Sequence, residues 1–313
     1  MTASPLSSRR PPASLTSLDE GPLSRARPIN PIIRIGSQED APLAGSICHA
    51  AFNAIAGQHG FPPDFPNPDV AIGLIDHLVS RADVHAVIAE LDGRVVGSNF
   101  LWEGDSVAGV GPITVDPAVQ NGRIGRRLME AVIERARRKG IASVRLVQAA
   151  YHLRSLSLYT RLGFEVREPL SVVQGPPLNL TIDGRHVRPA TAADVAVADQ
   201  LHQSIHGYAR TRELRVAIEQ GTAMVVERDR RLTGYTTGIG FFGHAVGEAD
   251  EDLQAMIGSA RSFVGPGFLI PSRNAALMRW CLQHGLRFVQ PMTLMTMGPY
   301  QEPRVAFLPS VLF

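Results

Sequence analysis

The stretch Val115–Met129, which reads VDPAVQNGRIGRRLM, decides the fold that we expect for this chain. It begins at the end of a short β-branched run, Ile113–Val115, and passes through Asp116-Pro117. A helix then continues to Lys139, because apolar residues recur at every fourth position on one face, namely Ile124, Leu128, Val132 and Ala136. The stretch therefore predicts a strand, a loop and a helix that packs one face on a core.

The loop Gln120–Gly125 is suited to bind a pyrophosphate. A glycine-containing loop that leads into a helix directs several unpaired backbone N–H groups to one point, and the helix dipole adds positive potential there. Arg126 and Arg127 follow in the first turn, where one of them is placed to contact a phosphate. The alternative is a plain connection, since glycine loops before helices also serve as connectors.

This stretch resembles the GNAT superfamily of acetyl-CoA-dependent N-acetyltransferases. The family pattern is a strand that ends in Val-x-Pro, then Gln or Arg, two residues, Gly, one residue, and Gly or Ala. Gln120 and Gly125 match it, whereas Arg123 stands at the first glycine position, directly after Gly122. The resemblance implies that acetyl-CoA is bound by the end of the strand and the loop, at Thr114, Val115, Gln120, Asn121, Gly122, Arg123, Ile124, Gly125, Arg126 and Arg127. The backbone N–H near Thr114 or Val115 would stabilise the oxyanion of a tetrahedral intermediate.

A second segment, Arg154–Val166 (RSLSLYTRLGFEV), resembles the same family, which has Leu-Tyr, three residues and Gly-Phe at this place. The resemblance gives Tyr159 the role of the acid that protonates the departing thiolate, and the alternative is a core tyrosine that seals the cofactor tunnel. The family often has Asn where this chain has His152. His152 either relays a proton or contacts the cofactor, or it only caps the helix that follows.

The acceptor side is less well defined by the sequence. Four prolines in Phe61–Asp69 exclude a helix or a central strand, so this segment is a stiff loop. In the family this position forms the acceptor-side wall, which makes Asp64 and Phe65 candidates for substrate binding. A general base is not evident, and the candidates are Glu103, Asp105, a water molecule and the terminal carboxylate of Phe313.

Composition narrows the other classes of function. The chain of 313 residues is 44% hydrophobic with a formal net charge of +2, so nothing in it requires a nucleic acid or a membrane surface. Cys48 and Cys281 lie in apolar helical contexts and read as reduced core thiols. We find no apolar run of 18 residues, and we expect a soluble, cytoplasmic protein without a metal site.

The sequence contains an internal repeat on the scale of a domain. Arg188, Thr191 and Asp194 repeat the spacing of Arg34, Ser37 and Asp40, and Asn274–Leu286 parallels His152–Phe164. The second copy has no phosphate loop, because its helix start carries the carboxylates Glu248, Asp250, Glu251 and Asp252, which repel a pyrophosphate. The string Gly238-Ile-Gly240-Phe-Phe-Gly243 matches a dinucleotide fingerprint, but no helix is expected after it, so we interpret it as glycines in a bent strand.

These observations predict an α/β (α+β) protein of two GNAT-like domains, each a mixed, mostly antiparallel sheet flanked by helices. We expect a disordered tail at residues 1–30, a catalytic domain at 31–172, a connector at 173–185 and a degenerate second domain at 186–313. The expected activity is direct transfer of an acetyl group from acetyl-CoA to a small-molecule or peptide amine, by a monomer or homodimer. The alternative is an acyl-CoA-binding sensor without turnover.

Overall fold

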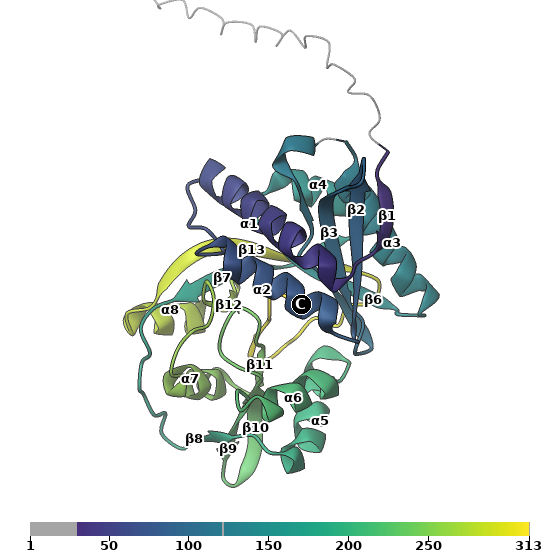
Figure 1. The fold of residues 1–313 in the computed structure, drawn as a ribbon. Helices are drawn as coiled ribbons and strands as arrows, with labels where there is room; N and C mark the ends of the chain where they lie inside the picture. The colour runs from purple at the N-terminus through teal and green to yellow at the C-terminus, as the bar shows by residue number, and fades with distance from the viewer. Residues whose placement is uncertain (1–29, 121, 313) are drawn as a thin grey trace, which may run out of the picture.

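The computed structural model describes residues 30–120 and 122–312, which form two sheets and eight α-helices in that part of the chain (Figure 1). The predicted α/β class is confirmed. The elements of the first half are β1 (Ile32–Ile35), α1 (Ala41–Gln58), α2 (Pro68–Ser80), β2 (Val84–Leu91), β3 (Arg94–Trp102), β4 (Val107–Val110), β5 (Thr114–Val115), α3 (Ile124–Arg138), β6 (Ser143–Ala149), α4 (Leu153–Arg161) and β7 (Glu165–Gln174).

The second half repeats this order of strands and helices, and most of its elements are shorter than their counterparts. They are β8 (His186–Pro189), α5 (Val195–His206), α6 (Thr211–Glu219), β9 (Met224–Arg228), β10 (Arg231–Thr236), β11 (Ala245–Gly247), α7 (Asp250–Ser259), β12 (Phe268–Pro271), α8 (Ala275–Gln283), β13 (Arg287–Met297) and β14 (Phe307–Leu308). The smaller sheet has the order β14-β11-β10-β9-β8 and is antiparallel throughout.

The larger sheet joins the two halves by an exchange of strands. Its order is β1-β2-β3-β4-β6-β13-β7-β12, with β5 paired to β3. β13 of the second half lies between β6 and β7 of the first, and β7 in turn lies between β13 and β12. The sequence did not reveal this exchange, because each strand alone reads as part of its own half.

Helices cover both faces of the larger sheet, and the alternation of side chains along β2 shows how. Val87 and Ala89 pack with α3 in one core cluster, whereas Ala86 and Ile88 pack with α1 and α2 in another. Successive side chains of a strand point to opposite faces, so a strand covered on both sides is apolar at neighbouring positions. The apolar stripe predicted for α3 is buried as expected.

The repeated motif forms the same structure in both halves. The Arg34 guanidinium bonds both oxygens of Asp40, at 2.7 and 2.8 Å, and Glu90 at 2.8 Å. Arg188 likewise bonds both oxygens of Asp194, at 2.8 Å each, and Glu227 at 2.6 Å. Each arginine therefore fixes the turn before a helix to a neighbouring strand.

One predicted strand is interrupted. The strand that we expected to end at Val115 is short, because the chain breaks between β4 and β5, where Gly111 adopts a φ of +135° that favours glycine. β4 pairs in parallel with β6 only over residues 107–109, and β5 pairs with β3 instead. The end of this strand and the end of β6 therefore run apart.

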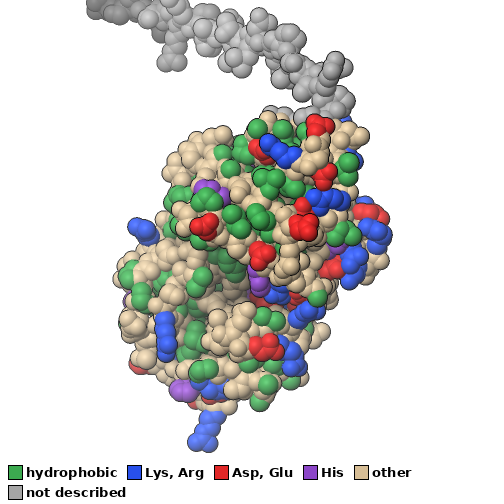
Figure 2. Space-filling model, in the orientation of Figure 1, with side chains coloured by type: hydrophobic (Ala, Val, Ile, Leu, Met, Phe, Trp, Pro, Cys, Tyr) green, Lys and Arg blue, Asp and Glu red, His purple; other side chains and the backbone are tan. Residues whose placement is uncertain are grey.

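The surface carries mixed charges. On the face drawn in Figure 2, basic and acidic side chains lie next to one another rather than in separate patches of one sign. Within the described residues, none of the helices has the length and apolar character needed to cross a membrane.

Candidate functional site

The predicted cofactor site lies where β5 leads into α3. Thr114 is buried, and its hydroxyl lies 3.2 Å from that of Ser98 on β3. The Gln120 side chain donates to the carbonyl of Val115 at 3.2 Å and accepts a hydrogen bond from Arg154 at the start of α4. Gln120 thus connects the end of β5, the loop and α4, which brings the two family-like motifs together.

The loop itself explains how an arginine replaces the expected glycine. Arg123 is the residue before α3 and has φ +61°, in the left-handed region that glycine adopts most readily. Its side chain is exposed while Gly122 and Ile124 are buried, so the substitution projects outward. A Cβ added at Gly125 would lie 3.7 Å from Leu158 and from Val115, which is ordinary van der Waals contact, so the backbone there is not tightly covered.

The remaining predicted loop residues lie at the edge of this site. Arg126 forms an ion pair with Glu130 at 2.8 Å on the exposed face of α3, and Arg127 donates to the side-chain oxygen of Asn30. Asn121 lies outside the described residues. The backbone at the start of α3 is therefore the part of the loop best placed for phosphate binding.

A short chain of polar side chains runs along α4. His152 Nδ1 lies 2.7 Å from the hydroxyl of Ser155, and Ser155 also forms a hydrogen bond with Tyr159. Burial raises the pKa of Tyr159 to about 12, and burial lowers the pKa of His152 to about 4. At neutral pH the phenol therefore keeps its proton and the imidazole is neutral. The His152 side chain makes no capping hydrogen bond to the helix backbone.

The proline-rich loop contributes a carboxylate to the other side of the site. Asp64 Oδ1 accepts a hydrogen bond from Gln290 Nε2 at 3.1 Å, and Gln290 Oε1 accepts one from the Tyr151 hydroxyl at 3.3 Å. Burial raises the pKa of Asp64. Gln290 belongs to β13, so the second half of the chain supplies the residue that joins Asp64 to the segment before α4.

Tyr151, which lies near this carboxylate, is part of a cluster of aromatic rings. Phe61 and Tyr151 are stacked, with centroids 4.2 Å apart and planes at 9°, and His59 lies 5.3 Å from Tyr151. Phe65 is buried and packs edge-to-face on Phe52, with centroids 5.6 Å apart. The structure therefore places Asp64 next to Tyr151 and places Phe65 in the core below the loop.

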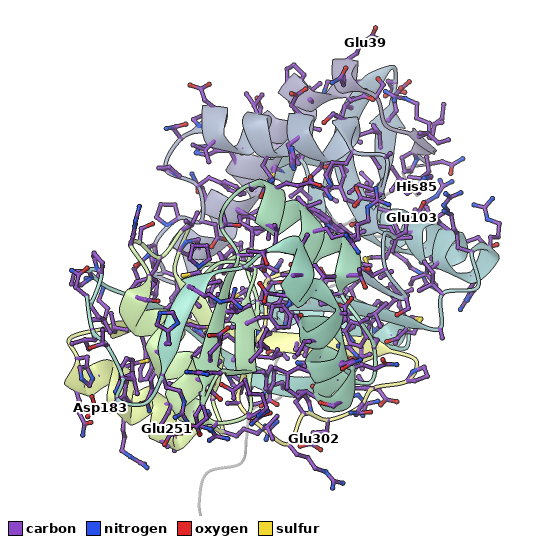
Figure 3. The ribbon with its side chains drawn as sticks, turned by 90° about the horizontal axis from the view of Figure 1, so that it is seen from below. Glu39, His85, Glu103, Asp183, Glu251 and Glu302 are labelled. Atoms are coloured by element: carbon purple, nitrogen blue, oxygen red, sulfur yellow. The ribbon has the colours of Figure 1, made fainter. Side chains whose placement is uncertain are left out.

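The other candidates for a general base are occupied or lie elsewhere. Glu103 bonds Arg135 at 2.7 Å and Lys139 at 3.1 Å, which lowers its pKa, and Figure 3 shows it beside His85. Asp105 lines a separate cavity between the two halves. Phe313 lies outside the described residues.

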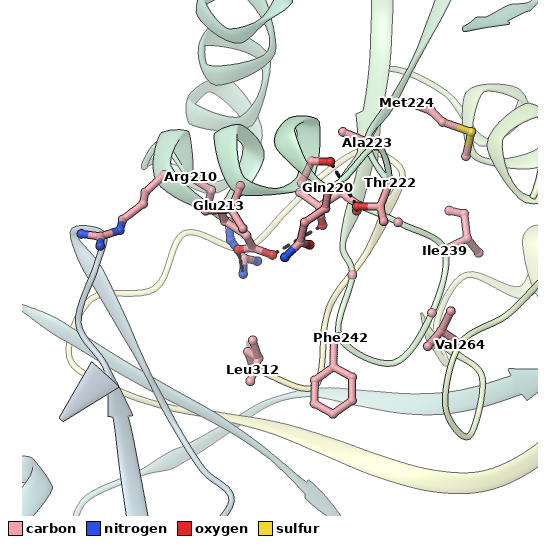
Figure 4. A pocket seen from close by; sticks show the side chains of 18 of the residues that line it. Arg210, Glu213, Gln220, Thr222, Ala223, Met224, Ile239, Phe242, Val264 and Leu312 are labelled. Carbon is pink, nitrogen blue, oxygen red and sulfur yellow. Dashed lines mark hydrogen bonds and ion pairs between the residues drawn. The ribbon is translucent and has the colours of Figure 1, made fainter. Parts of the chain in front are cut away.

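That cavity has a volume of about 800 Å³ and lies between α2 and β3 of the first half and α6 and β9 of the second (Figure 4). The Gly238–Gly243 string lines it as a loop after β10 and not, as we expected, as a bent strand. A Cβ at Gly243 would lie 2.0 Å from the Gly238 carbonyl oxygen, so this glycine permits the loop to close on itself.

The corresponding helix start in the second half is filled by its own carboxylate. Asp252 is fully buried and accepts hydrogen bonds from Arg185 at 2.6 Å, from Thr233 at 2.9 Å and from the backbone N–H of Ala249 at 3.0 Å. Glu248 pairs with Arg231. The positive end of α7 is therefore already satisfied by an anion that belongs to the chain. Among the described residues, no group of three His, Cys, Asp or Glu side chains is placed to hold a metal ion.

Several residues of the site were missed from the sequence, among them Ser155 and Gln290. Ser155 could have been found, since it lies three residues after His152 and four before Tyr159 on one helix face. Gln290 had no signal, because its contact with Asp64 spans 226 residues.

Comparison with known proteins defines the family. The model of the acetyltransferase (GNAT) family matches residues 53–164. An IAA acetyltransferase of Azospirillum brasilense is 30% identical over 108 residues, which cover 34% of this chain and 70% of that protein. The chain therefore belongs to the GNAT family of acetyltransferases.

Two solved structures share the fold along most of the chain. A Pyrococcus horikoshii protein described as an acetyltransferase has a TM-score of 0.69 at 18% identity, over 90% of this chain and 94% of its own. A GCN5-related N-acetyltransferase from Sphaerobacter thermophilus has a TM-score of 0.58 at 16% identity, over 88% of this chain and 98% of its own. The similarity in fold thus extends over both halves.

Proposed function

We propose that the first half transfers an acetyl group from acetyl-CoA to an amine. The observation that carries this proposal is the position of Gln120, which holds the loop before α3, the end of β5 and the start of α4 in one place. The N–H groups at the start of α3 suit a pyrophosphate, and the room beside Gly125 suits its approach to the backbone. The residues present therefore fit this substrate.

In the proposed reaction the neutral amine nitrogen attacks the thioester carbonyl, a new C–N bond forms as the C–S bond breaks, and the nitrogen releases its extra proton to water. Backbone N–H groups near Thr114 and Val115 would stabilise the oxyanion of the tetrahedral intermediate. Tyr159 would donate its proton to the departing sulfur and would regain one through Ser155 and His152. The phenol is suited to this role because its raised pKa keeps it protonated at neutral pH.

We infer that Asp64 binds the amine in its cationic form. Asp64 accepts its hydrogen bond from the neutral Gln290 amide, and no cation is among the groups that shift its pKa, so no basic partner compensates it among the described residues. Tyr151 lies near it and packs against Phe61 and His59, and aromatic faces also attract cations. Because burial raises its pKa, Asp64 would accept the amine proton more readily than an ordinary carboxylate. Phe65 would support the loop from below.

The test is release of free thiol from acetyl-CoA in the presence of amines, of carboxylic acids and of IAA, the compound in the name of the Azospirillum brasilense relative. Turnover with amines, accompanied by mass-shifted N-acetyl products, is the expected result. Acetyl-CoA binding without turnover on any acceptor would instead favour an acyl-CoA sensor. Failure to bind acetyl-CoA would exclude both functions.

A further inference from the structure

A buried charge lies away from the proposed acetyl-transfer site, at the contact between the two halves. Arg145 on β6 is 3% exposed and directs its side chain toward the second half. Its guanidinium lies between two aromatic rings, 4.6 Å from the centroid of Tyr208 and 5.0 Å from that of Tyr300. It donates one hydrogen bond, from Nη1 to the Tyr208 hydroxyl at 3.0 Å. Two aromatic faces stabilise a cation but do not neutralise it.

No carboxylate compensates this charge within the described part of the chain. Burial lowers the pKa of Arg145, and the neighbouring groups that shift it further are Tyr208, Tyr300 and a second cation, Arg210. Arg210 has its own partner, Glu213. A guanidinium keeps its proton at any ordinary pH, so Arg145 is a buried positive charge without a negative one. Such burial is costly unless an anion accompanies it.

A small cavity lies directly against this guanidinium. Its volume is about 10 Å³, which admits one water-sized guest. It is lined from both halves, by Arg145, His202, His206, Tyr208, Arg210, His244, Leu294, Tyr300, Phe307, Leu308 and Pro309. Three buried polar atoms around it have no hydrogen-bond partner, namely Arg145 Nε, His206 Nδ1 and the Tyr300 hydroxyl.

The other two histidines of the cavity are already engaged. His202 Nδ1 lies 2.6 Å from the Tyr208 carbonyl oxygen, and His244 lies 3.1 Å from Glu213 and 2.9 Å from the Tyr235 hydroxyl. A metal cation is disfavoured beside two arginines. The unpartnered Arg145 Nε and Tyr300 hydroxyl, together with the uncompensated charge of Arg145, point to a guest that accepts hydrogen bonds and carries a negative charge.

We propose that this cavity binds one small inorganic anion, of which chloride is the representative, through Arg145, Tyr300 and His206. The volume excludes sulfate, phosphate and organic carboxylates, so selectivity follows from size. Because Arg145 belongs to the first half and Tyr300 and His206 to the second, the bound anion would hold the two halves together. Anion binding would therefore stabilise the native chain.

The experiment measures the thermal midpoint of the full chain in sodium chloride against sodium gluconate, each from 1 to 300 mM at constant ionic strength. Gluconate is too large for the cavity. We expect chloride and bromide to raise Tm by roughly 2–6 °C relative to gluconate. This shift assumes a site that is half-occupied at an anion concentration of a few millimolar. Crystals grown in sodium bromide should show an anomalous peak within hydrogen-bond distance of the Arg145 guanidinium. Equal Tm values in chloride and gluconate, or a water molecule at this position, would overturn the proposal.

Variants separate this site from general salt effects. Arg145→Met should abolish the difference between chloride and gluconate, Arg145→Lys should retain part of it, and Tyr300→Phe should raise the chloride concentration for half-effect several-fold. The matched control is Arg138→Met on the exposed face of α3, where the full chloride effect should remain. If Arg145→Met does not fold, the wild-type titration and the bromide peak still decide. A chloride effect that persists in a folded Arg145→Met would contradict the assignment.

Discussion

Replacing Tyr159 with Phe tests the proposed acid directly. The substitution removes one hydroxyl and leaves the ring, which is 5% exposed and lies 6.1 Å from Phe164, centroid to centroid. Loss of a general acid lowers kcat by about 10²–10⁴-fold, which corresponds to roughly 3–5 kcal/mol in the barrier. Loss of the hydrogen bond to Ser155 should cost only about 0.5–1.5 kcal/mol of unfolding free energy.

The pH profile sharpens this prediction. An acid must be protonated to act, so its contribution falls as the pH rises through its pKa. Because burial raises the pKa of Tyr159 to about 12, the wild-type kcat should show no loss between pH 7 and pH 10 that depends on this residue.

Steady-state kinetics with an amine whose chemical step limits the rate provide the measurement. The matched control is Tyr235→Phe in the second half, which also removes a buried hydroxyl, here one that lies 2.9 Å from His244 Nε2. It should lose similar stability and keep its kcat. A kcat of Tyr159→Phe within about twofold of wild type would show that Tyr159 is a packing residue and not the acid.

Four further predictions concern separate parts of the chain. Asp64→Asn should raise KM for the amine at least about tenfold and leave KM for acetyl-CoA unchanged, because the carboxylate would bind only the amine. The control is Asp69→Asn, which changes an exposed carboxylate at the start of α2. An equal rise in both KM values would contradict the role of Asp64. Calorimetry should show one acetyl-CoA site per chain, and Gly125→Glu should abolish it. Gly73→Glu is the control and should preserve the site, since a Cβ at Gly73 meets nothing within 4 Å. Two sites per chain would refute the assignment of acetyl-CoA binding to the first half. Arg188→Met should lower the unfolding free energy by about 1–2 kcal/mol at pH 7, after allowance for solvent screening. The Arg188 guanidinium lowers the pKa of Asp194, so the stabilisation is complete above the unfolded pKa near 4 and is lost as the pH falls toward and through the folded pKa. Denaturant unfolding should therefore show that the difference in unfolding free energy between wild type and variant narrows as the pH falls. A difference that stays constant down to pH 2 would be inconsistent with this reasoning. A chain that ends after Gly184 lacks β13, so β6 and β7 lose the strand between them and the fragment should aggregate; a soluble, active fragment would argue against this reasoning.

Local patterns predicted local structure well. The four-residue spacing of Ile124, Leu128, Val132 and Ala136 predicted the buried face of α3, and the residues Arg188, Thr191 and Asp194 predicted the repeat of a turn that the structure shows in both halves. In each case the interaction that forms the structure lies within a few residues of the pattern. The sequence around these residues is therefore enough to predict the buried face of α3 and the turn before each helix.

Contacts between distant segments were not predictable from local patterns. The pairing of β13 with β6 joins residues such as Thr296 and Arg145, and neither strand shows which neighbour it will take. Phe65 illustrates the same limit, because a phenylalanine in a proline-rich loop gives no indication that Phe52 of α1 will cover it. Gln290 entered the candidate site for the same reason, through a strand whose position only the complete sheet defines.

The position of β13 also has a consequence for synthesis on the ribosome. β7 ends at Gln174 and β13 begins at Arg287, so 113 residues of translation separate the strands that pair in the middle of the larger sheet. At about 5–20 residues per second, the nascent first half waits roughly 6–23 s with the edges of β6 and β7 open. Gln290, the partner of Asp64, arrives only after that interval, as part of β13. A stalled or truncated message would therefore yield a chain that holds the proposed acetyl-CoA loop but lacks Gln290 of the proposed acceptor side, and the proposed reaction would begin only once translation had passed β13.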